Sequence, residues 1–433
     1  MAPRSTLDDL ERRTFRWFWD TADPHTFLIP DRWPTKSFSS IAAVGFGLAA
    51  YCIGAERGYV SREQARDRVL STLQSLLALP EGPQPGGASA YHGFFYHFLD
   101  MQSGARYKDV ELSTIDSTWL FAGALVCQSY FDRDDPREAA IRDAAERLYA
   151  RAEWDWASPR APLISMGWYP EKGFHTYDWR GYDEGMMVYI LALGSPSHPA
   201  DPAGWNAWTS TYRWDTFYGQ QFIQFAPLFG HQYTQMFIDF RGIQDAYTRE
   251  RGIDYFENSR RATITQRAYA MENPNHWNDY GANIWGLTAC DGPADTTIDG
   301  RTYHTYTARG AAAGDIRDDG TIAPTAAASS IAFTPEISVA AIEEMQRRYG
   351  SLLYRQYGFA DAFNPTFRGT SQFGTVDPDH GWFDVDYLGI DQGPIIVMIE
   401  NYRSGLIWNV MKKNPHVMQG LRRAGFTGGW LDQ

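Results

Sequence analysis

The stretch SSIAAVGFGLAAYCIGAE, residues 39–56, decides the fold of this chain. It holds no charged residue before its last position and is apolar on almost every side of a helical projection. A helix of this kind is buried all round, so other helices must surround it. Residues 113–131 form a second stretch of the same type. The two stretches predict a helical protein with an inner set of fully buried helices.

Helices with one polar face alternate with these buried ones. Residues 61–64, SREQ, make a capping box that opens a helix with leucines on one face. Residues 135–138, DPRE, open a charged amphipathic helix with a cap followed by proline. Further helices are expected at residues 6–21, 181–193, 201–214, 231–240, 254–271, from 334 onward, 393–412 and 415–423.

Buried and polar-faced helices in alternation suit two concentric rings, an inner one shielded from water and an outer one exposed. We therefore predict an all-α fold, an (α/α)6 barrel or six-hairpin toroid, with long aromatic loops at one end. No Pro/Ser-rich linker or block of charge divides the chain, so residues 1–433 are expected to form a single domain.

The connections between the helices are long, aromatic and rich in glycine. Residues 89–97, SAYHGFFYH, and residues 154–179 are two examples, and residues 273–334 contain no convincing helix. Long structured loops in a compact domain usually carry function. We expect the functional site among them.

Composition excludes several classes of partner. A net charge of −13 argues against binding to nucleic acid or anionic membranes, which require basic patches. No apolar run approaches the ~20 residues that span a bilayer, so no membrane insertion is expected. Cys52, Cys127 and Cys290 are too few and too scattered for a disulfide framework. We expect a cytoplasmic protein, or a periplasmic one if a leader has been removed, and no oligomeric state is predicted.

Three apparent cofactor motifs do not hold. Residues 45–50, GFGLAA, match a dinucleotide fingerprint, but no strand precedes them, so close helix packing explains them better. The histidines have no HExxH spacing, which argues against a transition-metal centre. Residues 315–320, DIRDDG, lack the full calcium-loop pattern. The sequence predicts neither a metal nor a cofactor.

The stretch WRGYDEGMMVY, residues 179–189, places Glu184 among aromatic residues where an apolar helical run begins. Apolar surroundings raise the pKa of a carboxyl group, so it can carry a proton near neutral pH. Flat rings also stack on the C–H faces of sugars. Glu184 is therefore a candidate glycosidase acid, although an acid favoured by a helix N-terminus is an equally good interpretation.

Other carboxylates stand at the starts of inner-type helices. Asp116, Glu336 and Asp391 each occupy such a position, and the N-termini of inner helices in a helical barrel open at one end. Each has a simpler interpretation as part of a cap or a first helical turn. Taken together, with so many aromatic loops, two carboxylates acting on a glycosidic bond are the leading chemistry.

The chain resembles glycoside hydrolase family 144, a bacterial glucoamylase-like family whose characterised members are endo-β-1,2-glucanases. The resemblance runs nearly from end to end. It is carried by residues 40–47, 91–97, 113–116, 165–168, 181–184, 193–196, 230–233, 285–289 and 389–394.

This resemblance implies an (α/α)6 barrel and an inverting hydrolysis that needs no metal. The essential glutamate of the family aligns with Glu184, and its acidic position after Ser-Thr aligns with Asp116. Related transglycosylating domains of cyclic β-1,2-glucan synthases carry a second glutamate just after a Trp-Gly pair. Here residues 287–291 read LTACD, which favours hydrolysis over transglycosylation.

The expected function is endo-cleavage of β-1,2-glucan to short sophorooligosaccharides. Glu184 is the expected general acid and Asp116 the general base that activates water, with Asp391 as the alternate base. Residues expected to bind substrate, each with core or loop packing as the alternative, are Tyr91, His92, Phe94, Trp168, Tyr182, Asp183, His231, Arg261, Trp285 and Glu336.

Three other functions stay open at this point. The enzyme could release sophorose from a chain end, transglycosylate, or hydrolyse another β-glucan. A carbohydrate-binding protein without turnover is a weaker alternative, since binding alone does not require the pair of Asp116 and Glu184.

Overall fold

The computed structural model describes residues 5–433, so Met1–Arg4 of the expected domain lie outside the described residues. Helices hold 44% of the described residues, which confirms the prediction of a helical protein. They are α1 (Thr6–Thr21), α2 (Ile41–Glu56), α3 (Arg62–Ala78), α4 (Thr114–Tyr130), α5 (Pro136–Ala150), α6 (Met186–Gly194), α7 (Ala203–Thr209), α8 (Phe229–Phe237), α9 (Ala246–Arg251), α10 (Tyr255–Glu272), α11 (Pro324–Ala328), α12 (Pro335–Tyr349), α13 (Gly389–Arg403), α14 (Leu406–Met411) and α15 (Pro415–Arg423).

The strands are two to four residues long and lie in the connections. They form two- and three-stranded antiparallel ribbons rather than a common sheet. They are β1 (Arg32–Trp33), β2 (Ser39–Ser40), β3 (Ala90–Tyr91), β4 (Phe94–Phe95), β5 (Phe98–Leu99), β6 (Leu112–Ser113), β7 (Gly167–Tyr169), β8 (Gly173–Phe174), β9 (Trp214–Phe217), β10 (Gln220–Ile223), β11 (Ala289–Cys290), β12 (Thr296–Ile298), β13 (Arg301–Tyr303), β14 (Thr307–Ala308), β15 (Gly310–Ala312), β16 (Asp315–Arg317), β17 (Tyr354–Arg355), β18 (Gly358–Phe359), β19 (Phe363–Asn364), β20 (Thr375–Asp377), β21 (Gly381–Phe383) and β22 (Tyr387–Leu388).

Some predicted helix boundaries were wrong. The single helix expected at residues 393–412 is two helices, α13 and α14, because Gly405 between them adopts a left-handed conformation with φ 71°. The helix expected at 201–214 ends at Thr209, and Trp214 begins strand β9 instead. The segment 273–334, expected to lack helices, contains the short helix α11.

The two stretches that predicted the fold, α2 and α4, pack directly against each other. A Cβ atom added to Gly45 of α2 would lie 2.2 Å from the carbonyl oxygen of Trp119. One added to Gly123 of α4 would lie 2.0 Å from the carbonyl oxygen of Gly45. Only glycine permits this approach of the two backbones, so the interpretation of residues 45–50 as a packing motif is confirmed.

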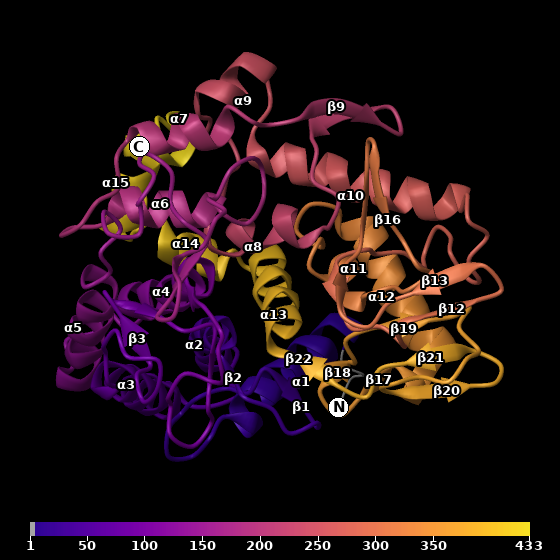
Figure 1. Ribbon diagram of the computed structural model, residues 1–433, viewed down its shortest axis with the longest axis horizontal. Helices are drawn as coiled ribbons and strands as arrows, with labels where there is room; N and C mark the ends of the chain where they lie inside the picture. The colour runs from indigo at the N-terminus through magenta and orange to yellow at the C-terminus, as the bar shows by residue number, and fades with distance from the viewer. Residues whose placement is uncertain (1–4) are drawn as a thin grey trace.

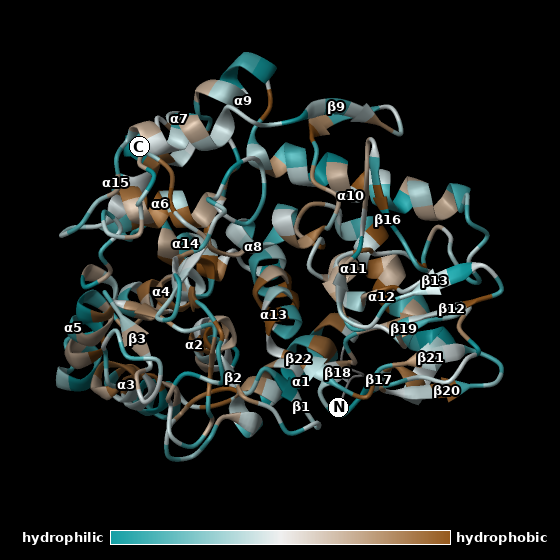
Figure 2. Ribbon diagram, viewed as in Figure 1, coloured by the Kyte–Doolittle hydropathy of each residue, from teal (hydrophilic) through white to brown (hydrophobic). Residues whose placement is uncertain are grey.

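Buried helices form the centre and polar-faced helices cover them (Figure 1). The helix α13 lies in the middle of the view and packs on α2, α8 and α11, while α4 packs on α2 and α6. On the outside, α1 and α3 cover α2, α5 covers α4, α15 covers α6, α10 covers α8 and α12 covers α11. Hydrophobic residues concentrate on α2 and α4, whereas α5 at the edge carries hydrophilic ones (Figure 2). None of the helices between residues 5 and 433 is both long and apolar enough to cross a membrane.

Short strands tie the starts of three buried helices to the loops beside them. Strands β2, β6 and β22 run directly into α2, α4 and α13. The backbone N–H of Ile41 donates to the carbonyl of His97 (3.2 Å), and that of His97 donates to the carbonyl of Glu111 (2.9 Å). The N–H of Gly389 likewise donates to the carbonyl of Asp31 (2.8 Å). Polar loop residues are thereby held against the N-termini of the inner helices.

Candidate active site

A cavity of about 330 Å³ opens where α2, α4 and α13 begin. Its size is at the lower end of the range for small-molecule sites. The walls combine aromatic rings with carboxyl groups, and none of the described lining residues is a lysine or arginine. They are Ala42, His97, Glu111, Ser113, Ile115, Asp116, Trp119, Met166, Tyr169, His175, Trp179, Glu184, Phe229, Tyr233, Ala289, Tyr306 and Ile390.

Glu184 lines this cavity from the turn that precedes α6, and its side chain is half-buried. Burial raises the pKa of Glu184 well above its usual range, and the nearby Asp183 and Asp116 carboxylates raise it further. Such a carboxyl group holds a proton near neutral pH. Because it faces the open space of the cavity, it can deliver that proton to a group bound there.

Asp116 lines the same cavity from the first turn of α4. The capping interpretation holds for Ser113, whose hydroxyl oxygen accepts the N–H of Asp116 at 3.1 Å. The reciprocal half of a capping box is not formed, because the Asp116 carboxylate accepts the Ser113 hydroxyl instead, at 2.5 Å. Burial raises the pKa of Asp116, while the charge of His97 opposes that rise. The carboxylate of Asp116 thus bonds the side chain of the cap residue and also lines the cavity.

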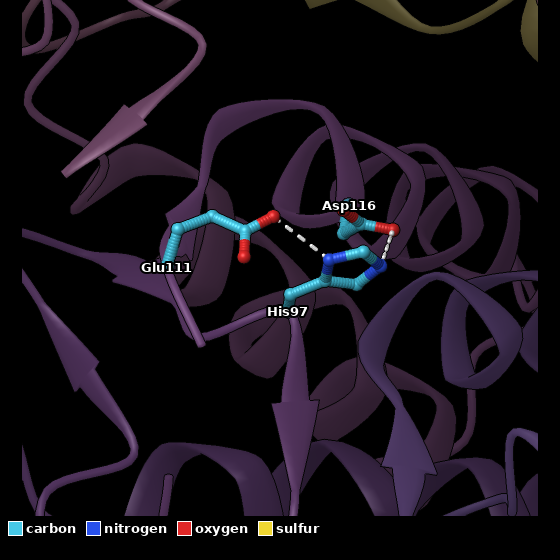
Figure 3. Close-up of side chains that lie close together, drawn as sticks. All are labelled: His97, Glu111 and Asp116. Atoms are coloured by element: carbon cyan, nitrogen blue, oxygen red, sulfur yellow. Dashed lines mark hydrogen bonds and ion pairs between the residues drawn. The ribbon is translucent and has the colours of Figure 1, made fainter. Parts of the chain in front are cut away.

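His97 lies between two carboxyl groups (Figure 3). Its Nδ1 is 2.8 Å from Oε1 of Glu111, and its Nε2 is 3.5 Å from Oδ1 of Asp116. Burial alone lowers the pKa of His97, but Asp116 and Glu111 outweigh it and raise the pKa to about 9. At neutral pH the ring is therefore a cation, which favours the ionised form of Asp116.

His97, Glu111 and Asp116 also have the spacing of a metal site, with ligand atoms within 4.8 Å of one another. Both ring nitrogens here face carboxylates, so the arrangement fits an ion-paired imidazolium better than a metal ligand.

Aromatic rings form much of the cavity wall. Trp119 and Trp179 are almost wholly buried, and Trp179 is fixed by donating from Nε1 to Oγ1 of Thr114 (2.9 Å). Tyr233 is fixed by donating to the carbonyl of Ile390 (2.9 Å). Tyr306, in contrast, is 49% exposed at the cavity edge. Rigid walls with one exposed ring suit the apolar faces of a sugar.

Asp391, the alternate base, does not line the cavity, although its neighbour Ile390 does. It is 2% exposed and lies in the first turn of α13, where it makes no N-cap hydrogen bond. Burial raises the pKa of Asp391 to about 7. The structure thus brings Asp116 and Glu184 together at one cavity and leaves Asp391 outside it.

Four of the residues expected to bind substrate lie in the hydrophobic core. Phe94 and Trp285 are fully buried. Tyr182 packs against Tyr255 and against His231, which is 1% exposed and bonded through Nε2 to the carbonyl of Phe225 (3.0 Å). Burial lowers the pKa of His231 to about 4, so it is neutral at physiological pH. None of the four reaches the cavity.

Three others form an aromatic group beside the cavity. Tyr91 packs on Trp168 with ring centroids 5.1 Å apart, and His92 stacks on Trp156 at 4.2 Å. Trp168 shares strand β7 with Tyr169, which lines the cavity. These half-buried rings pack on one another, and none of them lines the cavity.

The last three expected binding residues are polar and stand apart. Asp183 accepts the N–H of Gly185 (2.8 Å), and burial raises its pKa to about 7. Arg261 on α10 is paired with Glu257 (2.8 Å). Glu336 is exposed in the first turn of α12. Of these, Asp183 is adjacent in sequence to Glu184 and influences its charge state.

Several cavity residues escaped the sequence analysis. His97 closes the motif at residues 91–97, and Glu111 stands two residues before Ser113, so both are within or beside stretches that were singled out. Their role depends on the pairing of β5 and β6 with neighbouring loops, which spacing alone does not reveal. Tyr306 is in the segment 273–334, where no pattern distinguishes it from other loop aromatics.

Comparison with known proteins identifies the family of this chain. Residues 176–415, more than half of the chain, match the family described as "Putative glucoamylase". A solved structure described in the same words, from Bacteroides uniformis, superposes with a TM-score of 0.85 at 32% identity over 100% of both chains. The chain therefore belongs to this glucoamylase-like family, and the resemblance found in its motifs is confirmed.

Two further relatives carry named activities. The endo-β-1,2-glucanase of Chitinophaga pinensis, solved with sophorotriose and glucose, superposes with a TM-score of 0.84 at 27% identity, covering 99% of this chain and 100% of that one. The exo β-1,2-glucooligosaccharide sophorohydrolase (non-reducing end) of Parabacteroides distasonis is 29% identical over 98% of this chain. The chain spans 58% of the length of that curated relative.

Proposed function

We propose that this protein is a glycoside hydrolase that cleaves β-1,2-glucan with inversion, and that Glu184 is its general acid. The observation that carries the proposal is the convergence of Glu184 and Asp116 on one aromatic-walled cavity. Two relatives that align over nearly the whole chain act on β-1,2-glucans by name. Binding alone would require no such pair of acids, which disfavours a carbohydrate-binding protein without turnover.

The raised pKa of Glu184 suits it to protonate the departing glycosidic oxygen. Asp116 is the base of choice because it reaches the cavity and Asp391 does not. The His97 cation, which Glu111 orients from the other side, favours the ionised form of the Asp116 carboxylate. In the inverting reaction, water activated by Asp116 attacks the face of the sugar opposite the leaving group.

The arrangement of helices supports an (α/α)6 barrel as the scaffold. The buried helices α2, α4, α6, α8, α11 and α13 each pack on at least one outer helix. We also infer a single domain, since α1 near the start of the chain packs on α13 near its end. The site would then occupy the end of the barrel where the inner helices begin.

In the first form of the proposal, the enzyme cleaves within the β-1,2-glucan chain and produces short sophorooligosaccharides. An exo-acting enzyme that releases sophorose is the second candidate, favoured by the likeness to the sophorohydrolase. The experiment is incubation with linear and cyclic β-1,2-glucans and other β-glucans, followed by sizing of early products. Mixed oligosaccharides from linear and cyclic chains support endo-action, sophorose from linear chains alone supports exo-action, and no cleavage of any β-1,2-glucan overturns the proposal.

Inversion makes its own prediction about the product. Fresh reducing ends should appear first as the α-anomer in proton NMR, because water attacks opposite the departing β-linked sugar. Initial β-anomer would instead require a covalent intermediate and would connect this chain with the transglycosylating relatives.

A further inference from the structure

A second group of acids lies outside the cavity, where three loop segments meet. The group, called the aspartate cluster below, consists of Asp291, Asp361, Asp384 and Asp386, and all four side chains are buried. Asp291 follows strand β11, Asp361 precedes β19, and Asp384 and Asp386 follow β21. The reaction proposed above uses none of them.

Backbone pairing fixes the geometry of the aspartate cluster. Strands β19 and β21 pair through Phe363 and Phe383, and the ladder continues as Asp384 N–H donates to the carbonyl of Ala362 (2.9 Å). Asp361 N–H then donates to the carbonyl of Asp386 (2.9 Å). The N–H of Asp291 joins this pair by donating to Oδ2 of Asp361 (2.8 Å). The carboxyl groups are thus held together by backbone rather than gathered by flexible side chains.

The aspartate cluster leaves buried oxygens without partners. Oδ2 of Asp384 and Oδ1 of Asp361 are shielded from solvent and accept no hydrogen bond from the described residues, and the same holds for Oδ2 of the neighbouring Asp391. An unsatisfied buried carboxylate oxygen costs free energy and calls for an explanation. Without a cation, these groups are crowded and destabilising.

The basic residues at hand do not neutralise the aspartate cluster. Arg32 donates from Nη1 to Oδ2 (2.7 Å) and from Nη2 to Oδ1 (3.4 Å) of Asp291, and from Nε it reaches Asp31 (3.3 Å). Its nearest approach to Asp386 is 3.8 Å, and it makes no ion pair with Asp384. Arg355 turns instead to backbone carbonyls, including that of Val385 (3.2 Å). Arg32 therefore pairs with Asp291 and Asp386, while no basic side chain among the described residues pairs with Asp361 or Asp384.

We propose that Asp291, Asp384 and Asp386 bind a hard divalent cation, with calcium as the best fit. Each of the three offers one carboxylate oxygen, and these oxygens lie within 4.8 Å of one another. Two ligands on opposite sides of a calcium ion at ~2.4 Å are about that far apart. Carboxylate oxygens with no sulfur or nitrogen donor are the ligands that Ca²⁺ prefers.

The bound cation acts on structure rather than on the reaction. Through its three ligands it joins the end of β11 to the segment that follows β21, two parts of the chain without a common helix. Ala289 of β11 and Ile390, just after β22, line the cavity. The cation therefore holds in place the loop segments that carry one side of the cavity wall.

The first test compares thermal unfolding of the full chain after EDTA treatment and dialysis, with and without added CaCl2. At a calcium concentration a hundred times the dissociation constant, we expect the Tm of the wild type to rise by about 3 °C. Magnesium serves as the comparison ion and should raise it less. An unchanged Tm in calcium overturns the proposal.

A variant and a matched control locate the effect. Asp384→Asn removes one ligand and one buried charge, so it should lose the calcium response and, in EDTA, be at least as stable as the wild type. Asp379→Asn makes the same change on an exposed residue of the same hairpin, between β20 and β21, and should keep the full response. A calcium response in Asp384→Asn equal to that of the wild type contradicts the assignment.

The second test needs no variant to fold. Trp382 lies two residues before Asp384, and Trp33 follows Arg32, so terbium at this site should show tryptophan-sensitised luminescence. We expect one equivalent of Tb³⁺ to bind and calcium to displace it. Sensitised luminescence that is absent, or that calcium fails to displace, overturns the proposal. Asp386→Asn provides a second variant in which the signal should fall.

Discussion

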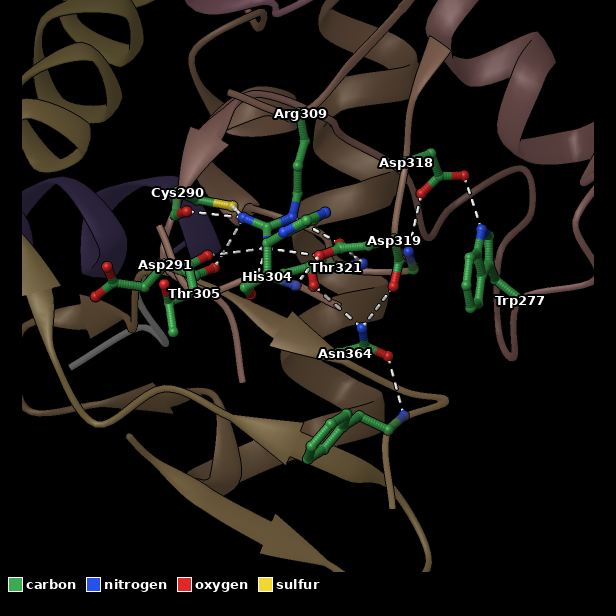
Figure 4. Close-up of polar contacts among 12 residues, drawn as sticks. Trp277, Cys290, Asp291, His304, Thr305, Arg309, Asp318, Asp319, Thr321 and Asn364 are labelled. Carbon is green, nitrogen blue, oxygen red and sulfur yellow. Dashed lines mark hydrogen bonds and ion pairs between the residues drawn. The ribbon is translucent and has the colours of Figure 1, made fainter. Parts of the chain in front are cut away.

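Two regions of this molecule bury carboxyl groups, and their surroundings shift the pKa of these groups in opposite directions. In the loop segment 273–334, Asp319 is bound by Arg309, which donates from Nε to Oδ1 (2.7 Å) and from Nη2 to Oδ2 (2.8 Å). Arg309 also donates to the carbonyls of Cys290 (2.8 Å) and His304 (3.0 Å), as Figure 4 shows. At the cavity, whose described lining holds no arginine, Glu184 has no such partner.

The difference decides what each acid can do. Burial acts to raise the pKa of Asp319, but Arg309 outweighs it and holds the pKa below its ordinary value. Burial also raises the pKa of Glu184, and its neighbours there are carboxylates that raise it further. An acid locked into its ionised form holds a loop together, whereas an acid that keeps its proton is available for chemistry.

The largest effect is expected from Glu184→Gln, which keeps the shape of the side chain and removes its proton. Hydrolysis of β-1,2-glucan should fall by at least ~10²–10⁴-fold, the range for loss of general acid catalysis. Oligosaccharide binding, measured by calorimetry, should survive because the cavity walls are intact. Turnover at the wild-type rate would remove Glu184 from the role.

Arg309→Ala should act on the other region and on stability. Removing one partner of a buried ion pair costs about 3–5 kcal/mol, because Asp319 is left buried and unpaired. The loss is measured by denaturant unfolding. Adding Asp319→Asn to the same variant should recover part of it, since the uncompensated charge is then gone. A variant as stable as the wild type would show that the bonds of Arg309 do not hold the loop.

Asp116→Asn separates a catalytic role from a capping role at one residue. The Ser113 cap uses the backbone N–H of Asp116, which the substitution keeps. The melting temperature should therefore stay nearly unchanged, while turnover falls by at least ~100-fold, the low end for loss of a general base. Both are measured on the same preparation. A variant with full activity would remove Asp116 from the reaction and return attention to Asp391.

The helical part of the fold was predictable because its pattern is local. Residues 39–56 are apolar around the whole helical period, and α2 is buried along nearly its whole length. The break at Gly405 was missed because an apolar helical pattern continues on both sides of it. The left-handed conformation of Gly405 depends on how the chain turns between α13 and α14, which the hydrophobic pattern does not show.

The site residues at the starts of helices were predictable from the sequence. Those positioned by the pairing of short loop strands were not. Asp116 and Glu184 precede or open buried helices, which identified them as candidates. Within residues 91–97, however, the strands are two residues long and give no alternation. Nothing local therefore indicates that Phe94 turns to the core while His97 turns to the cavity.

The smallest and most specific effect is expected from Asp183→Asn, which changes the charge next to Glu184 without touching the cavity. The side-chain amide oxygen that this substitution introduces can still accept the N–H of Gly185, so the turn is kept. Above the Asp183 pKa of about 7, the wild-type carboxylate raises the pKa of Glu184 and keeps its proton on at higher pH. The neutral amide removes this contribution, so Glu184 should lose its proton at lower pH.

The measurement is the pH dependence of kcat/KM, which reports the acid and the base of the free enzyme. In Asp183→Asn the alkaline limb should move to lower pH, because the acid form of Glu184 is required, while the acidic limb set by Asp116 stays in place. The exposed Asp201 provides the control, since Asp201→Asn makes the same change outside the cavity lining and should move neither limb. An alkaline limb that does not move in Asp183→Asn would mean that a group other than Glu184 donates the proton. That group, rather than Glu184, would then be the acid whose surroundings are to be compared with those of Asp319.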